Sequence, residues 1–175
     1  MGQNFKMVAK TLFGFEDLLA SELADLGALN IEKGTRVVHF EGDNGMMYKA
    51  NIACRTAIKV LKPIHSFHVK NEKMLYHGIM KIDWTAYLDL EKTFAIDATV
   101  FSEYFNHSKY VALKTKDAIA DFFVEKMGKR PDVDTDKPHL RINIHIAHDT
   151  CTVSLDSSGE SLHQRGYRQL TGFAP

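Results

Sequence analysis

Residues 6–40, KMVAKTLFGFEDLLASELADLGALNIEKGTRVVHF, contain strand and helix patterns that follow one another closely. The first five of these residues alternate weakly and predict a strand, and Gly14 separates that strand from an amphipathic helix. The apolar residues of the helix recur at helical spacing and end before Gly27: Phe15, Leu18, Leu19, Leu23 and Leu26. Residues 28–32 and 35–40 predict two more strands, with Lys33-Gly34 as the turn between them.

The next segment predicts a second helix and a fourth strand. Asp43 or Asn44 is expected to cap the helix, because either side chain can accept a hydrogen bond from a free amide of the first turn. Residues 56–67, rich in Ile, Val and Leu, predict the strand, with Pro63 near an edge or a bend. The order strand, helix, strand, strand, helix, strand predicts a ferredoxin-like domain over residues 1–66.

The second half of the chain predicts alternating helices and strands. Residues 71–88 predict an amphipathic helix that is interrupted near Asp83, and residues 93–101 alternate at period two and predict a strand. Residues 140–147 alternate strongly, and residues 151–155 follow across a turn as a further strand. This alternation of helices and strands predicts an α/β layer structure.

A long helix between these strands carries the first candidate binding residues. Ser108 is its expected N-cap and Gly128 its expected end. One face is apolar, with Val111, Ala118, Ile119, Phe122 and Phe123. Lys109 and Lys116, seven residues apart, lie together on the other side.

Composition excludes several classes of protein. The chain has 175 residues, 45% of them hydrophobic, which excludes a disordered chain. It contains no run of about 18 apolar residues and no export signal behind its first lysine, so we expect neither a membrane span nor secretion. Cys54 and Cys151 form no disulfide framework, and a reduced, cytoplasmic setting fits them best.

The sequence lacks the common motifs of catalysis and cofactor binding. It has no phosphate-binding P-loop, no dinucleotide-binding glycine motif, no nucleophile elbow and no HExxH metal helix. The pairs His65/His68 and His145/His148 lack third and fourth ligands, so we expect no metal site. Cys54, on an apolar helix face, is expected to be buried.

Local charge indicates where an anion would bind, because the 22 basic and 22 acidic residues cancel over the whole chain. Residues 109–130 hold six basic and three acidic groups. At a helix start, free amide groups and a partial positive charge favour a phosphate, which Ser108, Lys109 and Lys116 would surround. Lys114 belongs to the same basic segment, although an ordinary solvated helix face would also carry such lysines.

Two further positions are candidates for contact with nucleic acid. Arg141 lies within an otherwise apolar strand and either lines a basic groove or occupies the solvent side. Near the C-terminus, Arg165 and Arg168 flank Gly166-Tyr167, so that two guanidinium groups and the Tyr167 ring can meet phosphate and base together.

This last segment also carries a resemblance. Residues 161–168, SLHQRGYR, resemble the segment that closes the THUMP domain in a family of large-subunit ribosomal RNA guanine-N2 methyltransferases, often labelled N6-adenine-specific DNA methylases. Ser108 with LKTKDAI at 113–119 resembles the central helix of that family, and TLFGFE at 11–16 resembles its N-terminal domain. Ala174-Pro175 is similar to the start of the segment that opens the family's catalytic domain.

The resemblance implies a ferredoxin-like domain at 1–66, an RNA-binding THUMP domain at 67–168, and the start of a linker at 169–175. It implies ribosomal RNA as the first partner and transfer RNA as the second, with no membrane partner. The family's catalytic domain uses S-adenosylmethionine and carries a glycine-bearing cofactor loop and an Asn/Asp-Pro-Pro-Tyr/Phe motif. Neither motif occurs in these residues, so the chain is expected to bind no cofactor itself and to serve a methyltransferase domain in cis.

Two other classes of function remain open from the residues alone. One is a complete small enzyme, either a nuclease or a transferase, that uses the histidines and the run Asp132, Asp134, Asp136. The other is a protein-interaction or dimerisation module, because ferredoxin-like sheets often pair through exposed faces or edges.

Overall fold

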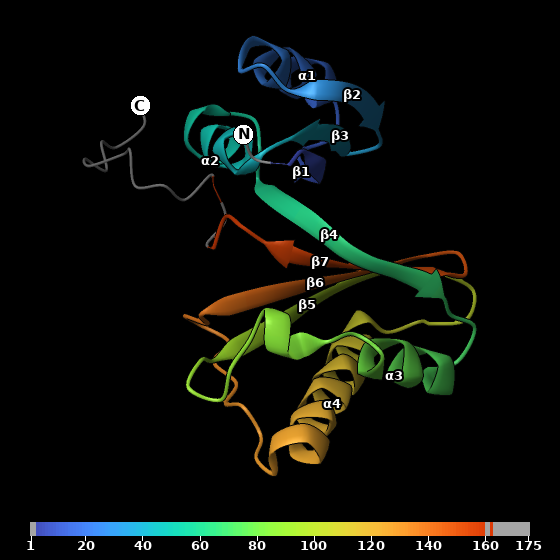
Figure 1. Ribbon diagram of the computed structural model, residues 1–175. Coiled ribbons are helices and arrows are strands. Elements are labelled where there is room, and N and C mark those ends of the chain that lie inside the picture. The colour runs from blue at the N-terminus through green and yellow to red at the C-terminus, as the bar shows by residue number, and fades with distance from the viewer. Residues whose placement is uncertain (1–2, 160–161, 163–175) are drawn as a thin grey trace, which may run out of the picture. The chain divides into compact units, whose positions relative to one another are not determined.

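The computed structural model describes residues 3–159 and Leu162 (Figure 1). By their internal contacts, residues 3–61 group with residues 157–159 and Leu162, and Lys62–Asp156 form a second unit. Each unit has its own hydrophobic core, so the two are described in turn.

The first unit has the predicted order of elements. Its strands and helices are β1 (Phe5–Lys10), α1 (Glu16–Asp25), β2 (Leu29–Gly34), β3 (Val37–Gly42), α2 (Asn44–Ala53) and the beginning of β4 (Lys59–His68). The strand order is β2-β3-β1-β4, and neighbouring strands are antiparallel. This confirms the ferredoxin-like prediction. The fourth strand continues through Pro63 and carries the chain into the second unit.

The core of this unit uses part of the apolar faces predicted by periodicity: at α1, Leu19 and Leu23 are buried, whereas Phe15 and Leu18 are exposed. It includes Met7, Ala9, Leu19, Leu23, Val38, Phe40, Ala50 and Val60, together with Leu162. Cys54 is buried at the end of α2, as expected. The amide of Leu162 donates to the carbonyl of Ile58 at 2.8 Å, which attaches this residue beside the start of β4.

The turn of the hairpin differs from the prediction. Gly34 pairs with Val37 inside the ladder, so the turn residues are Thr35 and Arg36 rather than Lys33-Gly34. Arg36 has a positive φ of 61°, a conformation for which glycine is the usual choice. Tertiary contacts hold it there, because its carbonyl accepts from the Thr11 amide at 2.9 Å and its amide donates to Glu16 Oε1 at 2.8 Å.

Asp43 is the N-cap of α2, and its side chain accepts a hydrogen bond from the Met46 amide at 2.9 Å. We expect Asp43→Ala to lower the free energy of unfolding by about 1 kcal/mol, because the Met46 amide loses its acceptor. Asp43→Asn keeps an acceptor oxygen and is the matched control, with a loss of only a few tenths of a kcal/mol expected. Urea unfolding measures both, and equal losses in the two variants would contradict the capping role.

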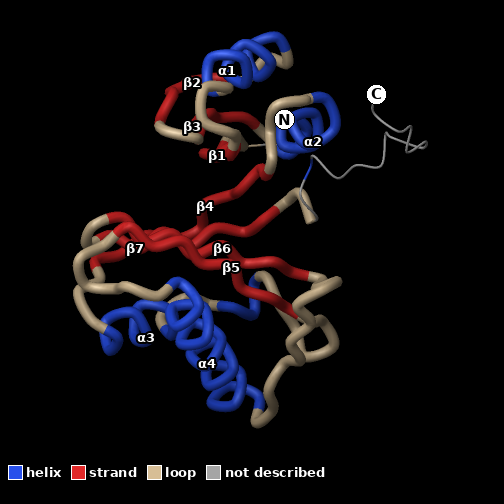
Figure 2. The backbone as a smooth tube through the Cα atoms, turned by 180° about the vertical axis from the view of Figure 1, so that it is seen from behind, coloured by secondary structure: helices blue, strands red, loops and turns tan. Residues whose placement is uncertain are grey.

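The second unit contains a four-stranded sheet, and the two α-helices of this unit lie on one face of that sheet (Figure 2). After β4 it contains α3 (Glu72–Met80), the short 3-10 helix η1 (Trp84–Ala86), β5 (Phe94–Phe101), α4 (Ser108–Met127), β6 (Leu140–Ala147) and β7 (Thr150–Asp156). The strand order is β4-β7-β6-β5, in which β5 and β6 are parallel and β6 and β7 antiparallel. The predicted interruption lies at Asp83, which caps η1.

The apolar face predicted for the long helix is the face that packs on the sheet. Its five predicted residues are buried with Ile142, Ile144, Ile146 and Val153. Gly128 ends α4 in the left-handed conformation (φ 73°), as predicted.

The prediction that Ser108 caps α4 is wrong. His107 occupies the N-cap position, with φ −130° and ψ 109°, and Ser108 is the first helical residue. An N-cap residue needs an extended backbone, and a cap at Ser108 would place the first helical residue at 109, whereas the chain is already helical at Ser108, one residue earlier.

Candidate nucleic-acid interface

The starts of α3 and α4 lie beside a pocket of about 360 Å³ in the second unit. Its lining comes from the residues that lead into the two helices and from their first turns: Lys70, Asn71, Glu72, Tyr104, Phe105, Asn106, His107 and Tyr110. Two helix N-termini at one pocket bring two sets of amide groups and two partial positive charges to the same place.

The α4 side of the pocket keeps its amide groups available. Among the described residues, no side chain caps the first turn of α4. Ser108 and Lys109 follow His107 directly and are exposed. An anion at this position would therefore meet free N–H groups and an ammonium group together.

On the α3 side, the Asn71 side chain accepts from the Met74 amide at 2.9 Å and caps the helix. Exposed Lys70 precedes this cap, and Glu72 is the acidic residue of the first turn. The α3 helix thus has its own acceptor and its own negative charge, whereas α4 has neither in its first turn.

Glu72 connects the two helices through its carboxylate. It forms an ion pair with Lys114 and accepts a hydrogen bond from the Tyr110 hydroxyl, both on α4. The hydrogen bonds from Lys114 and Tyr110 lower the pKa of Glu72, and the same contacts raise the pKa of each partner. In this arrangement the Lys114 ammonium is directed to a neighbouring side chain.

Aromatic rings form a further part of the lining. Tyr104 and Tyr110 are each 43% exposed, while Phe105 is buried and anchors the loop between β5 and α4. The Ser102 hydroxyl fixes this loop, because it donates to the carbonyl of His148 and accepts from the Tyr104 amide at 3.2 Å. Half-exposed rings on a loop held in place suit stacking with an unpaired base.

Lys116 and Arg141 have partners away from the pocket. Lys116 lies on the same face of α4 as Lys109, two turns further on, and its ammonium is 3.0 Å from Asp117. Arg141 pairs with Asp97 at 3.4 Å and donates to the carbonyl of Thr135 at 3.1 Å, with 17% of its side chain exposed. It lies beside Ala95 at the beginning of β5, whereas the pocket forms beyond the other end of that strand.

Of the eight residues predicted from sequence, none of those that the structure describes is among the residues that line the pocket. Ser108 and Lys109 directly follow the lining residue His107, and Lys114 pairs with the lining residue Glu72. Arg165, Tyr167 and Arg168 lie outside the described residues. The sequence reasoning missed Lys70, Asn71, Glu72 and Tyr104 as members of the site. The aromatic residues at 104, 105 and 110, close together and next to the candidate helix start, were the available signal.

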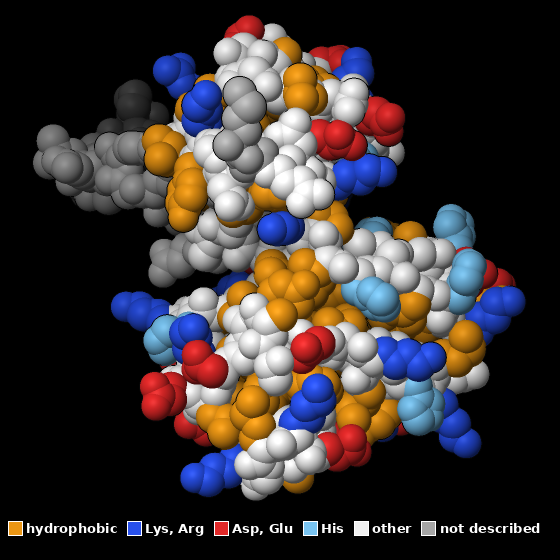
Figure 3. Space-filling model, viewed as in Figure 1, with side chains coloured by type: hydrophobic (Ala, Val, Ile, Leu, Met, Phe, Trp, Pro, Cys, Tyr) orange, Lys and Arg blue, Asp and Glu red, His pale blue; other side chains and the backbone are white. Residues whose placement is uncertain are grey.

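Figure 3 shows Lys, Arg and His side chains gathered on the side of the second unit where Figure 1 shows α3, with few acidic side chains among them. Among residues 3–159 and Leu162, no three His, Cys, Asp or Glu side chains are grouped as metal ligands. None of the described helices is both long and apolar enough to span a membrane.

Two family models match the chain. The THUMP domain model matches residues 69–156, and the RlmL ferredoxin-like domain model matches residues 6–61. Both matches agree with the family that the resemblance indicated, and they include the segments at 11–16 and 113–119, whereas the closing segment 161–168 lies outside both.

Two solved structures are similar to this chain over nearly all of its length. SMU.472, named as a candidate methyltransferase and solved with SAH, is 25% identical over 96% of this chain, with a TM-score of 0.79. A predicted N6-adenine-specific DNA methylase from Listeria monocytogenes str. 4b F2365 is 26% identical over 99% of the chain, with a TM-score of 0.80. This chain spans 45% of the length of each of these two proteins.

A more distant structure shares the fold alone. A 4-thiouridine synthetase solved in complex with RNA and ATP is 11% identical over 88% of this chain and 41% of its own, with a TM-score of 0.53.

Proposed function

Because the chain belongs to the THUMP domain family and begins with an RlmL ferredoxin-like domain, we propose that it binds RNA for a methyltransferase domain of the same polypeptide. The observation that carries this proposal is the pocket between the starts of α3 and α4, with its free amide groups, Lys70 and half-exposed tyrosines. Amides and lysines suit phosphates, and aromatic rings suit bases, so both parts of a nucleotide find a partner there.

The favoured target is ribosomal RNA, and transfer RNA is the second candidate. The match to the RlmL ferredoxin-like domain supports the first. Within either RNA we propose an unpaired element, because the bases of an A-form duplex are hidden in a deep and narrow groove. The Tyr104 and Tyr110 rings would stack on such bases.

The methyl donor of the whole protein is proposed to be S-adenosylmethionine. SMU.472 was solved with SAH, the product that this donor leaves after methyl transfer. This chain has no glycine-rich cofactor loop, so its own residues do not fit the donor. They hold and orient the RNA in the cytoplasm, while the methyltransferase domain supplies the chemistry.

Titration of a fluorescently labelled RNA hairpin tests the proposal. We expect binding at about 50 mM salt that weakens at least about tenfold at 200 mM, because each phosphate contact releases condensed cations. A blunt duplex of equal length should bind less tightly, since its bases are inaccessible to the tyrosines. Competition with ribosomal and transfer RNA fragments then ranks the two targets. Absence of binding at the lower salt, or equal affinity at both, would refute the proposed function.

A further inference from the structure

We infer that the Glu72 carboxylate occupies the position of an RNA phosphate at the pocket and thereby limits the affinity of the site for RNA. This inference rests on the proposed function and adds a residue that tunes it. The structure supplies three arguments, which concern the partners of Glu72, its surroundings and its freedom to move.

The partners of Glu72 are those that a phosphate would take. An ammonium and a phenolic hydroxyl, from Lys114 and Tyr110, converge on its carboxylate from one face of α4. Lysine and tyrosine are common donors to phosphate oxygens, and a carboxylate offers the same kind of anionic acceptor. Tyr110 and Glu72 both line the pocket, so the contact lies at the place where RNA is proposed to bind.

The charges around Glu72 are otherwise mainly positive. Lys70 lies before α3 and Lys73 follows Glu72 on the same helix, and both are exposed. On α4, exposed Lys109 lies between the lining residues His107 and Tyr110 in sequence, and Lys114 pairs with Glu72 itself. Glu72 is the one acidic residue among the described residues that line the pocket. A phosphate that enters is therefore repelled by this carboxylate and also competes with it for Lys114.

The carboxylate is free to leave. The Glu72 side chain is 46% exposed, and the Lys114 side chain is 29% exposed. Glu72 is in the first turn of α3, where a change of rotamer moves the carboxylate into solvent without disturbing the helix. Exposed ion pairs of this kind contribute little to stability, so an RNA phosphate can replace the carboxylate.

The experiment measures RNA affinity of the full chain with Glu72→Gln. Glutamine keeps the size of the side chain, removes the charge and releases Lys114. We expect the labelled hairpin to bind about three- to tenfold more tightly. We also expect its affinity to fall more steeply as salt rises, by the equivalent of about one additional phosphate contact. In the double variant Glu72→Gln/Lys114→Gln the gain should disappear, because the released ammonium is then absent.

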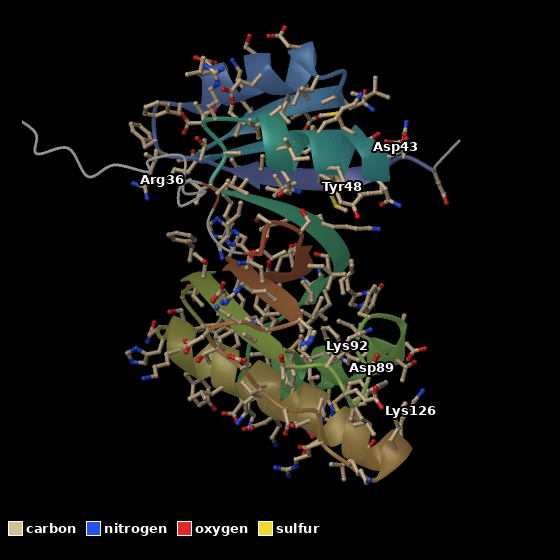
Figure 4. The ribbon with its side chains drawn as sticks, turned by 90° about the vertical axis from the view of Figure 1, so that its left-hand side faces the viewer. Arg36, Asp43, Tyr48, Asp89, Lys92 and Lys126 are labelled. Atoms are coloured by element: carbon tan, nitrogen blue, oxygen red, sulfur yellow. The ribbon has the colours of Figure 1, made fainter. Side chains whose placement is uncertain are left out.

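Asp89→Asn is the matched control. Asp89 forms an exposed pair with Lys92 at 2.9 Å in the loop after η1 (Figure 4), and neither residue lines the pocket. Asp89→Asn makes the same change in net charge as Glu72→Gln, and it also releases one lysine, Lys92. We expect the affinity for the hairpin to change less than about twofold, because this variant alters only the long-range, screened attraction between the protein and the RNA.

The outcomes separate this inference from the proposed function. If the wild-type chain binds no RNA, both are refuted. If the wild type binds but Glu72→Gln binds equally or more weakly, Glu72 positions Lys114 for RNA and the inference alone is overturned. Glu72→Ala is a second variant for the same comparison, and circular dichroism confirms that each variant is folded. A gain in Asp89→Asn equal to that in Glu72→Gln would also overturn the inference, since bulk charge would explain both.

Discussion

The double charge reversal Lys70→Glu/Lys109→Glu is expected to lower RNA affinity at least about tenfold, and to lower the salt dependence by about two phosphate contacts. Lys70 lines the pocket just before α3, and Lys109 lies in the first turn of α4, between the lining residues His107 and Tyr110 in sequence. Both are exposed, so their ammonium groups are accessible to an RNA phosphate. Fluorescence anisotropy at several salt concentrations measures both effects.

Lys126→Glu is the control for charge. Lys126 lies in the last turn of α4 (Figure 4). Because an α-helix rises 1.5 Å per residue, Lys126 is roughly 25 Å from Lys109 along the helix axis. That separation exceeds the screening length of about 10 Å at ordinary salt. We expect the affinity to change less than about twofold. An effect of Lys126→Glu as large as that of the pocket variants would mean that RNA binds along the whole helix.

The elements of the fold could be predicted from periodicity, because each buries one face against a core. The apolar residues of α1, spaced for a helix, include buried Leu19 and Leu23, and the alternation in β6 places Ile142, Ile144 and Ile146 in one core. These patterns, with the closing segment, indicated both domains of the family that the two matches confirm.

Local preference failed at two places, the hairpin turn at Arg36 and the N-cap of α4. Arg36 holds a left-handed turn because Thr11 and Glu16 bond to its backbone, and no local rule assigns that role to arginine. His107 is the N-cap of α4 although it makes no side-chain cap, whereas the local preference for a hydroxyl favoured Ser108. At Arg36 the preference of the single residue was overridden by contacts from elsewhere in the unit.

The candidate site could be predicted only in part, because half of it comes from another helix. Lys109 and Ser108 were indicated by the start of α4, but Lys70 and Glu72 lie more than thirty residues earlier and carry no motif. Charge counting treats every lysine alike, and only the structure shows that Lys114 faces Glu72 and that Arg141 faces Asp97. A count of charges along the chain gives no information on which residues from distant segments form pairs.

Trp84→Ala is expected to destabilise the protein by about 3–5 kcal/mol, the largest loss among the variants considered. Trp84 is completely buried in the core of the second unit, and its indole Nε1 donates to the carbonyl of Ile79 at 2.9 Å. Alanine leaves a cavity where η1 packs beside α3, and RNA binding should fail at lower temperature because both helix starts belong to this unit. Urea unfolding followed by circular dichroism measures the loss, since Trp84 is the only tryptophan and its fluorescence disappears with it.

Trp84→Phe separates packing from hydrogen bonding in this prediction. Phenylalanine keeps much of the apolar volume but removes the indole donor. The Ile79 carbonyl still accepts from the Ile82 amide at 3.2 Å, so no buried acceptor is left without a partner. We therefore expect Trp84→Phe to lose about 1–2 kcal/mol, well below the loss in Trp84→Ala. Equal losses in the two variants would show that the hydrogen bond, rather than the buried ring, holds η1 against α3.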